Sequence, residues 1–257
     1  MAWTMLKKAV LTGLTALALF GLQTEEPLAA QETSDEITKS IGLLKCQSGL
    51  MRWSSIATLT VDRQTIVGVG HFAAIDGGRE SSAVRSGKCN FVLYDRSGNV
   101  AFKSAVLLTA QGGSALDRRF SRATDWAVFH LTNPAPTTFR PVPLGRLERA
   151  ERKLPVRIFG MGRHGGERRL LRRSCTPSGE ATGSALLLYD CATGGGWSGA
   201  PILQPHEGQL QIVGLHSGRE SAHGVAVIFN EPIRKKVLEN SWYLARTHRP
   251  GPAAARQ

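Results

Sequence analysis

Residues 191–201 read CATGGGWSGAP, a glycine-rich turn that contains Ser198 and leads into an apolar run. Two other segments carry chemically useful side chains beside apolar runs. His71 follows the small residues of VGVG at 67–70, and Asp125 directly precedes WAVF at 126–129. A polar residue at the end of a strand can reach a surface cleft. The three segments therefore predict one site assembled from strand ends.

These three side chains meet the requirements of nucleophilic catalysis. A serine hydroxyl is weak until a base takes its proton, and histidine suits that task because its pKa lies near neutral pH. A buried carboxylate fixes the imidazole tautomer and stabilises the imidazolium. Backbone N–H groups beside the serine can converge on a developing oxyanion. We predict a triad of His71, Asp125 and Ser198, with an oxyanion hole at Gly196 and Ser198.

Short apolar runs separated by turn residues occupy both halves of the chain, a pattern that favours sandwiches or barrels over alternating strands and helices. The proline-rich segment 132–143 is typical of a linker between the halves. A hairpin turn is expected at 96–99. The expected strands are 56–61, 65–75, 90–94, 100–109 and 126–131, followed by 156–161, 185–189, 200–204, 209–216 and 224–229.

Only the end of the chain has a helical pattern. Asn230 can cap a helix, and Ile233, Val237 and Leu238 fall on one stripe. We expect this helix to pack on the second half. The arginine-rich stretch 168–173 is expected to be a solvated loop, with a polyanion-binding loop as the alternative.

The first thirty residues are typical of a signal peptide. Lys7 and Lys8 precede an apolar run from Ala9 to Leu22, and Ala30 is a small residue at the expected cleavage site. The run is shorter than the roughly 20 residues that a membrane span needs. We therefore favour a cleaved signal over a membrane anchor and expect a secreted or periplasmic protein without a transmembrane segment.

Composition limits the remaining classes. The 257 residues carry a formal net charge of +12, which permits an anionic partner without requiring one. Lysine-rich runs, zinc-finger cysteine spacing and aromatic RNA-binding signatures are all missing, so no dedicated nucleic-acid module is expected. The cysteines are far apart and form no CxxC, and no HxxxH occurs, so we expect no metal site and no cofactor.

The four cysteines have a different interpretation in an exported protein, where disulfides form readily. Three pairings are open. We favour Cys46–Cys89 and Cys175–Cys191, because each pair then stays within one half of the chain.

Together the segments resemble those of secreted bacterial trypsin-like serine proteases, most closely in the style of the glutamyl-endopeptidase-like branch. VGVGHFAA stands where that family has its Ala-Ala-His segment, TDWAVFHL its Asp-Ile-Ala-Leu segment, and GGWSGAP its Gly-x-Ser-Gly-x-Pro segment. VGLHSG resembles the strand that lines the primary specificity pocket. The resemblance implies an all-β, chymotrypsin-like fold of two six-stranded antiparallel β-barrels with a C-terminal helix. It also implies a serine endopeptidase that cleaves polypeptides through an acyl-enzyme.

The resemblance assigns roles to individual residues. His71 is the general base, Asp125 its orienting partner and Ser198 the nucleophile, while Ser217 matches a pocket-strand serine that supports the aspartate. Trp197 occupies the place where animal trypsins carry an aspartate that pairs with a freed N-terminus. That activation switch cannot operate here in the same form.

The resemblance also implies which residues form the specificity pocket. Ala192 stands where trypsins carry the aspartate that selects Lys or Arg, so that preference is disfavoured. Thr193 and His216 match the pair that binds a glutamate side chain, and a hydroxyl and an imidazole can both donate to a carboxylate. Arg219 lies nearby and adds positive charge. We expect an acidic P1 preference, with a pocket for small or apolar residues as the alternative.

Two other classes compete with the protease. An α/β-hydrolase would need G-x-S-x-G and the order Ser, acid, His, whereas position 200 is Ala and no aspartate follows Asp190. A catalytically weak, protease-like protein that binds anionic envelope polymers is the non-enzymatic alternative. We expect a monomer, divided into a signal peptide at 1–30, a leader at 31–40, an N-terminal barrel at 41–135, a C-terminal barrel at 136–230, a helix at 231–247 and a tail at 248–257.

Overall fold

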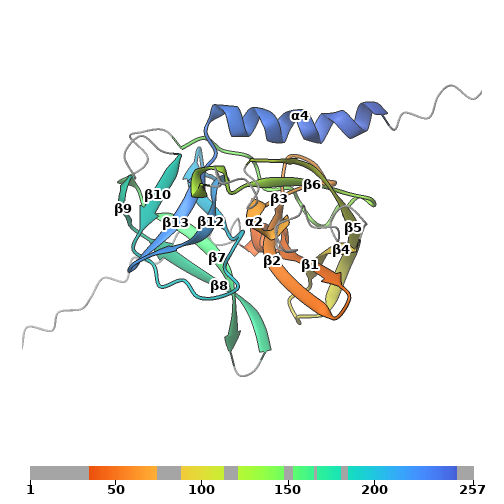
Figure 1. The fold of residues 1–257 in the computed structure, drawn as a ribbon, viewed down its shortest axis with the longest axis horizontal. Coiled ribbons are helices and arrows are strands. Elements are labelled where there is room, and N and C mark those ends of the chain that lie inside the picture. The colour runs from red at the N-terminus through yellow and green to blue at the C-terminus, as the bar shows by residue number, and fades with distance from the viewer. Residues whose placement is uncertain are drawn as a thin grey trace, which may run out of the picture.

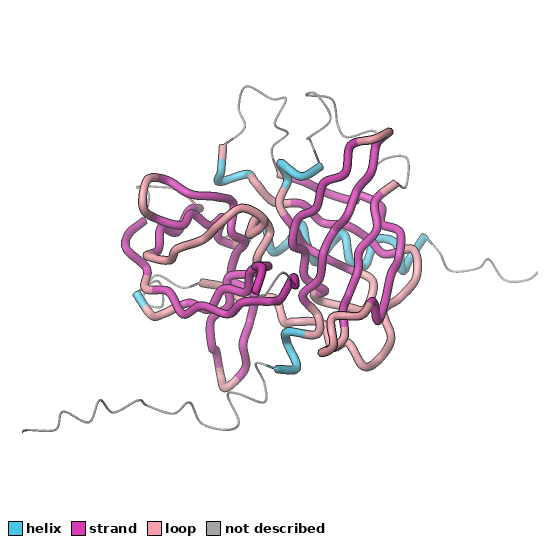
Figure 2. Tube along the Cα trace, turned by 90° about the horizontal axis from the view of Figure 1, so that it is seen from below, coloured by secondary structure: helices cyan, strands magenta, loops and turns pink. Residues whose placement is uncertain are grey.

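The computed structural model describes residues 35–73, 88–112, 121–147, 153–164, 167–180 and 185–247, without the side chains of 163–168, 180 and 242–247. The signal peptide expected at 1–30 and the tail expected at 248–257 lie outside these residues. Figures 1 and 2 show two β units side by side. The fold class predicted from the sequence, an all-β chymotrypsin-like double barrel with a C-terminal helix, is confirmed.

The first unit is a closed antiparallel barrel with the strand order β1-β2-β3-β6-β5-β4. Its wall is built from strands whose inward side chains, such as Ile56, Ile66 and Phe129, are fully buried. Burying apolar surface of this kind is the main favourable contribution to folding. The strands are β1 Ile41–Ser48, β2 Met51–Leu59, β3 Thr65–Gly68, β4 Cys89–Tyr94, β5 Val100–Gln111 and β6 Ala127–Leu131.

The turn between β4 and β5 is the hairpin expected at 96–99. The Asp95 carboxylate accepts hydrogen bonds from the amides of Ser97 and Asn99, each at 2.9 Å. Gly98 adopts a φ of 81°, a conformation that glycine reaches without steric cost. Local side-chain bonding and one glycine therefore fix the register of this hairpin.

The second unit is a curled seven-stranded sheet with the order β8-β7-β11-β12-β13-β10-β9. The runs expected from the sequence account for five of these strands, and the structure adds two strands at the sheet edges, β8 and β9. The strands are β7 Val156–His164, β8 Glu167–Cys175, β9 Pro177–Glu180, β10 Leu186–Tyr189, β11 Pro201–His206, β12 Gln209–Glu220 and β13 His223–Ile228.

Two local expectations are wrong, and one strand was not expected. The arginine-rich stretch 168–173 is not a loop, because it pairs with β7 throughout as part of β8. The strand expected at 65–75 ends at Gly68 and is followed by the short helix α2, Gly70–Ala73. Strand β1 follows a helical turn at 35–38 and was not expected from the sequence. A charged strand at a sheet edge lacks the apolar alternation by which strands are recognised, which accounts for β8.

Helix α4, Glu231–Thr247, is the C-terminal helix that the sequence predicts. The Asn230 side chain accepts the amide of Ile233 at 3.1 Å and caps it, and Ile233 and Val237 are buried. Its packing differs from the expectation, because it contacts β5 and β6 of the first barrel. Figure 1 shows α4 leaving the second unit and running along the first.

The proline-rich segment at 132–143 crosses between the units as an ordered bridge. Val142 donates its amide to Leu59 at 2.9 Å, and its carbonyl accepts the Thr60 hydroxyl at 2.6 Å. The next residue, Pro143, accepts the amide of Ile212 in β12 at 2.9 Å. Consecutive residues of the bridge are thus hydrogen-bonded to both units.

Candidate active site

The imidazole of His71 is held by a buried carboxylate. His71 lies in α2, directly after β3, and its Nδ1 is 2.8 Å from Oδ2 of Asp125. The backbone N–H of His71 donates to Oδ1 of the same carboxylate, also at 2.8 Å. The two contacts fix both the position and the rotation of the ring. The His71 side chain remains 30% exposed, so its other face is accessible to a substrate.

The carboxylate of Asp125 is turned inward by a short helical turn. The 3-10 turn η1, Arg122–Thr124, ends at Asp125, whose amide donates to the Arg122 carbonyl at 3.2 Å. Asp125 is fully buried, and Ser217 in β12 donates its hydroxyl to Oδ2. A buried carboxylate needs such partners to offset the loss of its hydration. Donors from α2 and β12 thus converge on Asp125, and these elements belong to different β units.

Ser198 lies in the glycine-rich turn before β11, as the sequence predicts. Its carbonyl accepts the amide of Ile56 at 2.9 Å and the hydroxyl of Ser55 at 3.0 Å, both in β2 of the first barrel. Gly199 has a φ of 81°, and a Cβ there would meet the Ile56 carbonyl at 2.0 Å. Glycine at 199 is therefore required for the close approach of this turn to the first barrel.

The same turn is tied to the second unit. The amide of Gly199 donates to the carbonyl of His216 at 2.9 Å, and the amide of His216 donates to Ala200 at 2.8 Å. His216 directly precedes Ser217, which bonds to Asp125. The Ser198 turn is thus connected through β12 to the cluster of His71, Asp125 and Ser217.

The open side of the turn is formed by glycine. Gly196 adopts a φ of 88°, and a Cβ at Gly194, Gly195 or Gly196 would meet no atom within 4 Å. Gly194 to Gly196 are exposed. The backbone on this side, including the amides expected to form the oxyanion hole, can be approached from solvent.

Trp197 points away from that open side. Its side chain is 4% exposed and lies on Gly160 of β7, where a Cβ would meet the indole ring at 2.0 Å. The guanidinium of Arg173 in β8 lies 5.8 Å from the ring centroid, within the range of a cation–π contact. The indole therefore anchors the turn in the second unit and leaves space around Ser198. The sequence alone did not indicate where this ring lies.

The three residues of the predicted specificity pocket lie close to the triad residues. Thr193 and His216 are buried, and the Thr193 hydroxyl oxygen has no hydrogen-bond partner within the described part of the chain. Arg219 donates to the Thr193 carbonyl at 3.3 Å. Ser217, expected to be a pocket-strand serine that supports the aspartate, directs its hydroxyl at Asp125.

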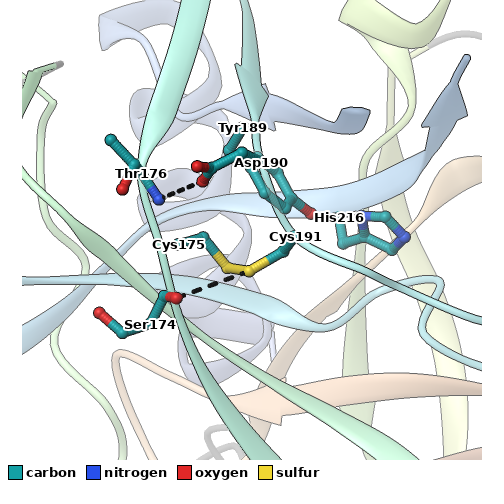
Figure 3. The surroundings of a disulfide bond; sticks show 7 residues. All are labelled: Ser174, Cys175, Thr176, Tyr189, Asp190, Cys191 and His216. Atoms are coloured by element: carbon teal, nitrogen blue, oxygen red, sulfur yellow. Dashed lines mark hydrogen bonds between the residues drawn. A yellow bond between two sulfur atoms is a disulfide. The ribbon is translucent and has the colours of Figure 1, made fainter. Parts of the chain in front are cut away.

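Tyr189 is a residue of this region that the sequence analysis missed. It is fully buried at the end of β10, and its hydroxyl is hydrogen-bonded to Nδ1 of His216, as Figure 3 shows. Burial raises the pKa of Tyr189. Burial also lowers the pKa of His216 to about 4, and the nearby His71, Arg122 and Arg219 act in the same direction. A buried tyrosine hydroxyl usually finds a partner, and that rule was the available signal in the run 185–189.

The four cysteines form two disulfides. Cys46 is bonded to Cys89 in the first barrel, and Cys175 to Cys191 in the second unit, which is the pairing that the sequence analysis favours. Beside the second bond, Asp190 accepts the amide of Thr176 at 2.6 Å (Figure 3). The start of the 191–201 segment is thereby fixed to the β8–β9 connection.

Within the described ranges, no group of three or more His, Cys, Asp or Glu side chains is arranged to hold a metal ion. No helix in the same part of the chain is both long enough and apolar enough to cross a membrane.

Comparison with known proteins identifies the fold. No family model and no curated protein sequence matches the chain. A glutamyl endopeptidase in complex with MPD is similar at a TM-score of 0.61 and 19% identity, over 79% of this chain and 90% of that one. A thermostable serine protease from an extremophilic microorganism is similar at a TM-score of 0.55 and 15% identity, over 83% of this chain and 99% of that one.

A serine endoprotease from Yersinia pestis gives a TM-score of 0.54 at 13% identity, over 84% of this chain and 69% of that one. The class defined by fold is therefore that of the chymotrypsin-like double barrels. Within that class the chain is similar to serine proteases, a glutamyl endopeptidase among them.

Proposed function

We propose that the protein is a serine endopeptidase. The observation that carries this proposal is the two-point contact between His71 and the fully buried Asp125. A carboxylate in this position favours the tautomer that carries a proton on Nδ1, which leaves Nε2 as the base. A partly exposed imidazole oriented by a buried carboxylate is the arrangement that a general base requires.

In the proposed mechanism, Nε2 of His71 takes the Ser198 hydroxyl proton while Oγ attacks the carbonyl carbon of the scissile peptide. The oxyanion that forms accepts hydrogen bonds from the backbone amides of Gly196 and Ser198. Loss of one such donor typically raises the activation free energy by about 2.7–4 kcal/mol. The imidazolium is stabilised by Asp125 and gives its proton to the leaving amine. Water, activated by the same histidine, then hydrolyses the acyl-enzyme.

Labelling with a fluorophosphonate tests the nucleophile, because this reagent reacts with activated serines. The comparison uses the mature chain from Gln31 onward, Ser198→Ala and His71→Ala, with Ser178→Ala as a matched serine control. We expect label on the parent and the control only. Unlabelled, folded parent protein with both disulfides intact would contradict the protease proposal.

We further propose that the pocket prefers an acidic P1 side chain. Three features support this preference: the unpartnered hydroxyl of Thr193, the imidazole of His216 and the positive charge of Arg219. A carboxylate that enters this pocket would accept hydrogen bonds from the first two groups and be attracted by the third. Profiling of peptides that differ only in Glu, Ala, Leu or Arg at P1 tests the proposal, and equal cleavage of Glu and Ala peptides would exclude it.

A second candidate function, binding of an anionic envelope polymer, is favoured by a basic cavity between the two units. The cavity has a volume of about 870 Å³, and its lining includes five cationic and two acidic residues: Lys39, Lys45, Arg96, Arg169, Arg172, Asp35 and Asp95. Salt-dependent binding of dextran sulfate by an unlabelled parent protein would favour this function. The two disulfides support a location outside the cytoplasm for either function.

A further inference from the structure

The neighbouring strand leaves room for the side chain of Tyr189 beside His216 of the proposed specificity pocket. Tyr189 ends β10 and pairs with Gly224 of β13, where a Cβ would meet Cε2 of the tyrosine at 2.3 Å and its hydroxyl at 2.9 Å. The missing side chain at 224 therefore makes room for the phenol. The Tyr189 and His216 rings lie 6.1 Å apart between centroids, with a hydrogen bond from the hydroxyl to Nδ1 (Figure 3).

Both members of this pair are neutral near pH 7. His216 is 2% exposed, and burial lowers its pKa to about 4. The charged and titratable groups around it are His71, Arg122 and Arg219, which lower the pKa further, and Asp125, which raises it. Burial raises the pKa of Tyr189, so the phenol keeps its proton.

The direction of the hydrogen bond follows from the neutral states. A neutral imidazole carries one N–H, and a neutral phenol has one proton to donate. Among the residues that the structure describes, the Tyr189 hydroxyl has no other acceptor than Nδ1 of His216. A phenol that donates to Nδ1 satisfies its own proton and places the imidazole proton on Nε2.

We propose that Tyr189 is a positioning residue of the specificity pocket, which holds His216 as the neutral tautomer with a proton on Nε2. This inference rests on the proposed protease function. The pocket then offers two neutral donors, the Nε2–H of His216 and the hydroxyl of Thr193, to one oxygen-bearing P1 side chain. Neutral donors bind an amide carbonyl as well as a carboxylate. Gln is therefore a second P1 residue of this pocket, and only Arg219 distinguishes it from Glu by charge.

Kinetics of Tyr189→Phe test the role, with Tyr94→Phe as a matched control outside the pocket. Without the Tyr189 hydroxyl, His216 no longer keeps its proton on Nε2, and the P1 side chain loses that donor. We expect kcat/KM to fall about five- to tenfold for P1 Glu and Gln peptides, mainly through KM, and less than twofold for P1 Ala. A hydrogen bond to the lone pair of Nδ1 favours the neutral imidazole, so its removal raises the pKa of His216. The Glu/Gln ratio should then rise as pH falls in Tyr189→Phe and stay flat between pH 6 and 8 in the parent.

If Tyr189 had a merely structural role, Tyr189→Phe would lower kcat/KM for the P1 Glu, Gln and Ala peptides by the same factor. The Glu/Gln ratio would then stay flat with pH in the variant as in the parent, and that result would overturn the proposal. Gly224→Ala, which displaces the phenol without removing it, should reproduce the selectivity of Tyr189→Phe.

The tautomer can be observed without any activity. Long-range ¹H–¹⁵N spectra of the mature chain in the Ser198→Ala background, with His216→Gln to assign the signal, report which ring nitrogen carries the proton. We expect Nε2–H in the parent protein. Nδ1–H or an imidazolium at pH 7 would overturn the role of Tyr189 even in a protein that folds normally. Absent peptide cleavage with an Nε2–H signal would instead contradict only the protease function on which the P1 selectivity depends.

Discussion

The two β units support their parts of the site in different ways. The first is closed, so each of its strands has two neighbours, and it carries His71 and Asp125. The second ends in two edge strands and carries Ser198 and the pocket residues. In the first unit the imidazole and carboxylate bond to one another directly, at 2.8 Å.

The parts in the second unit depend on contacts with distant segments. The Ser198 carbonyl is bonded to β2, Trp197 lies on Gly160 of β7, and the Cys175–Cys191 bond ties the segment to β8. The general base is therefore positioned by its own partner, whereas the nucleophile turn is positioned by the packing around it. Substitutions far from Ser198 should therefore affect the second unit more than the first.

The largest effect is expected at Asp125, because its carboxylate makes both of the hydrogen bonds that hold His71. Asp125→Asn keeps the shape of the side chain but favours the wrong imidazole tautomer, so we expect kcat to fall by roughly 10³–10⁴. Peptide hydrolysis by the chain from Gln31 onward measures this change. Asp95→Asn, in the exposed β4–β5 turn, is the matched control and should retain the parent rate. A loss below tenfold at Asp125 would contradict the dependence of the base on one partner.

Removal of each disulfide should affect the free energy of unfolding and the P1 selectivity differently. The sequence separations are 43 for Cys46–Cys89 and 16 for Cys175–Cys191. The chain-entropy model gives stabilisations of about 4 and about 3 kcal/mol respectively. We expect paired Cys→Ser variants to show these losses in urea unfolding, with P1 selectivity altered only in the second. Altered selectivity in both variants would contradict the division between the units.

The sequence predicted the fold better in the first unit than in the second. Short apolar runs locate all the barrel strands except β1, and Asp95 with Gly98 specifies the β4–β5 hairpin by local chemistry. The edge strands β8 and β9 were missed. An edge strand tolerates charge and proline because one side makes no ladder bonds, so it resembles a loop in the sequence.

The candidate site shows the same limit. The segments around His71, Asp125 and Ser198 are recognisable because the chemistry demands those residue types, and their roles stay predictions that the experiments above address. Tyr189 and the ring of Trp197 were not predictable, because their positions depend on Gly224 and Gly160. Each ring fills the space that a glycine on another strand leaves free. Such a glycine is distant in the sequence, so no pattern near the aromatic residue reveals it.

Acid should weaken the second unit through His216. The unfolded chain binds a proton on this histidine below pH 6.5, whereas the folded chain, with a pKa of about 4, does not. The unfolded state then binds more protons, so stability is complete above pH 6.5 and is lost as the pH falls toward 4, by up to about 3 kcal/mol. Urea unfolding at pH 7.0, about 5.5 and about 4.5 should give a smaller pH-dependent loss for His216→Gln than for the parent. Parallel losses in the two proteins would contradict this origin.

The smallest expected effect tests whether packing alone positions the nucleophile. In Gly160→Ala the new methyl group would lie 2.0 Å from the Trp197 ring, so the indole and the adjoining Ser198 must shift. Overpacking of this kind costs about 1–3 kcal/mol. Gly179→Ala is the control, because a Cβ there meets no atom within 4 Å. We expect Gly160→Ala to slow fluorophosphonate labelling about tenfold, in line with a barrier increase of roughly 1.4 kcal/mol. Destabilisation without slower labelling would show that the bonds from Ser198 to β2 are sufficient to hold the turn.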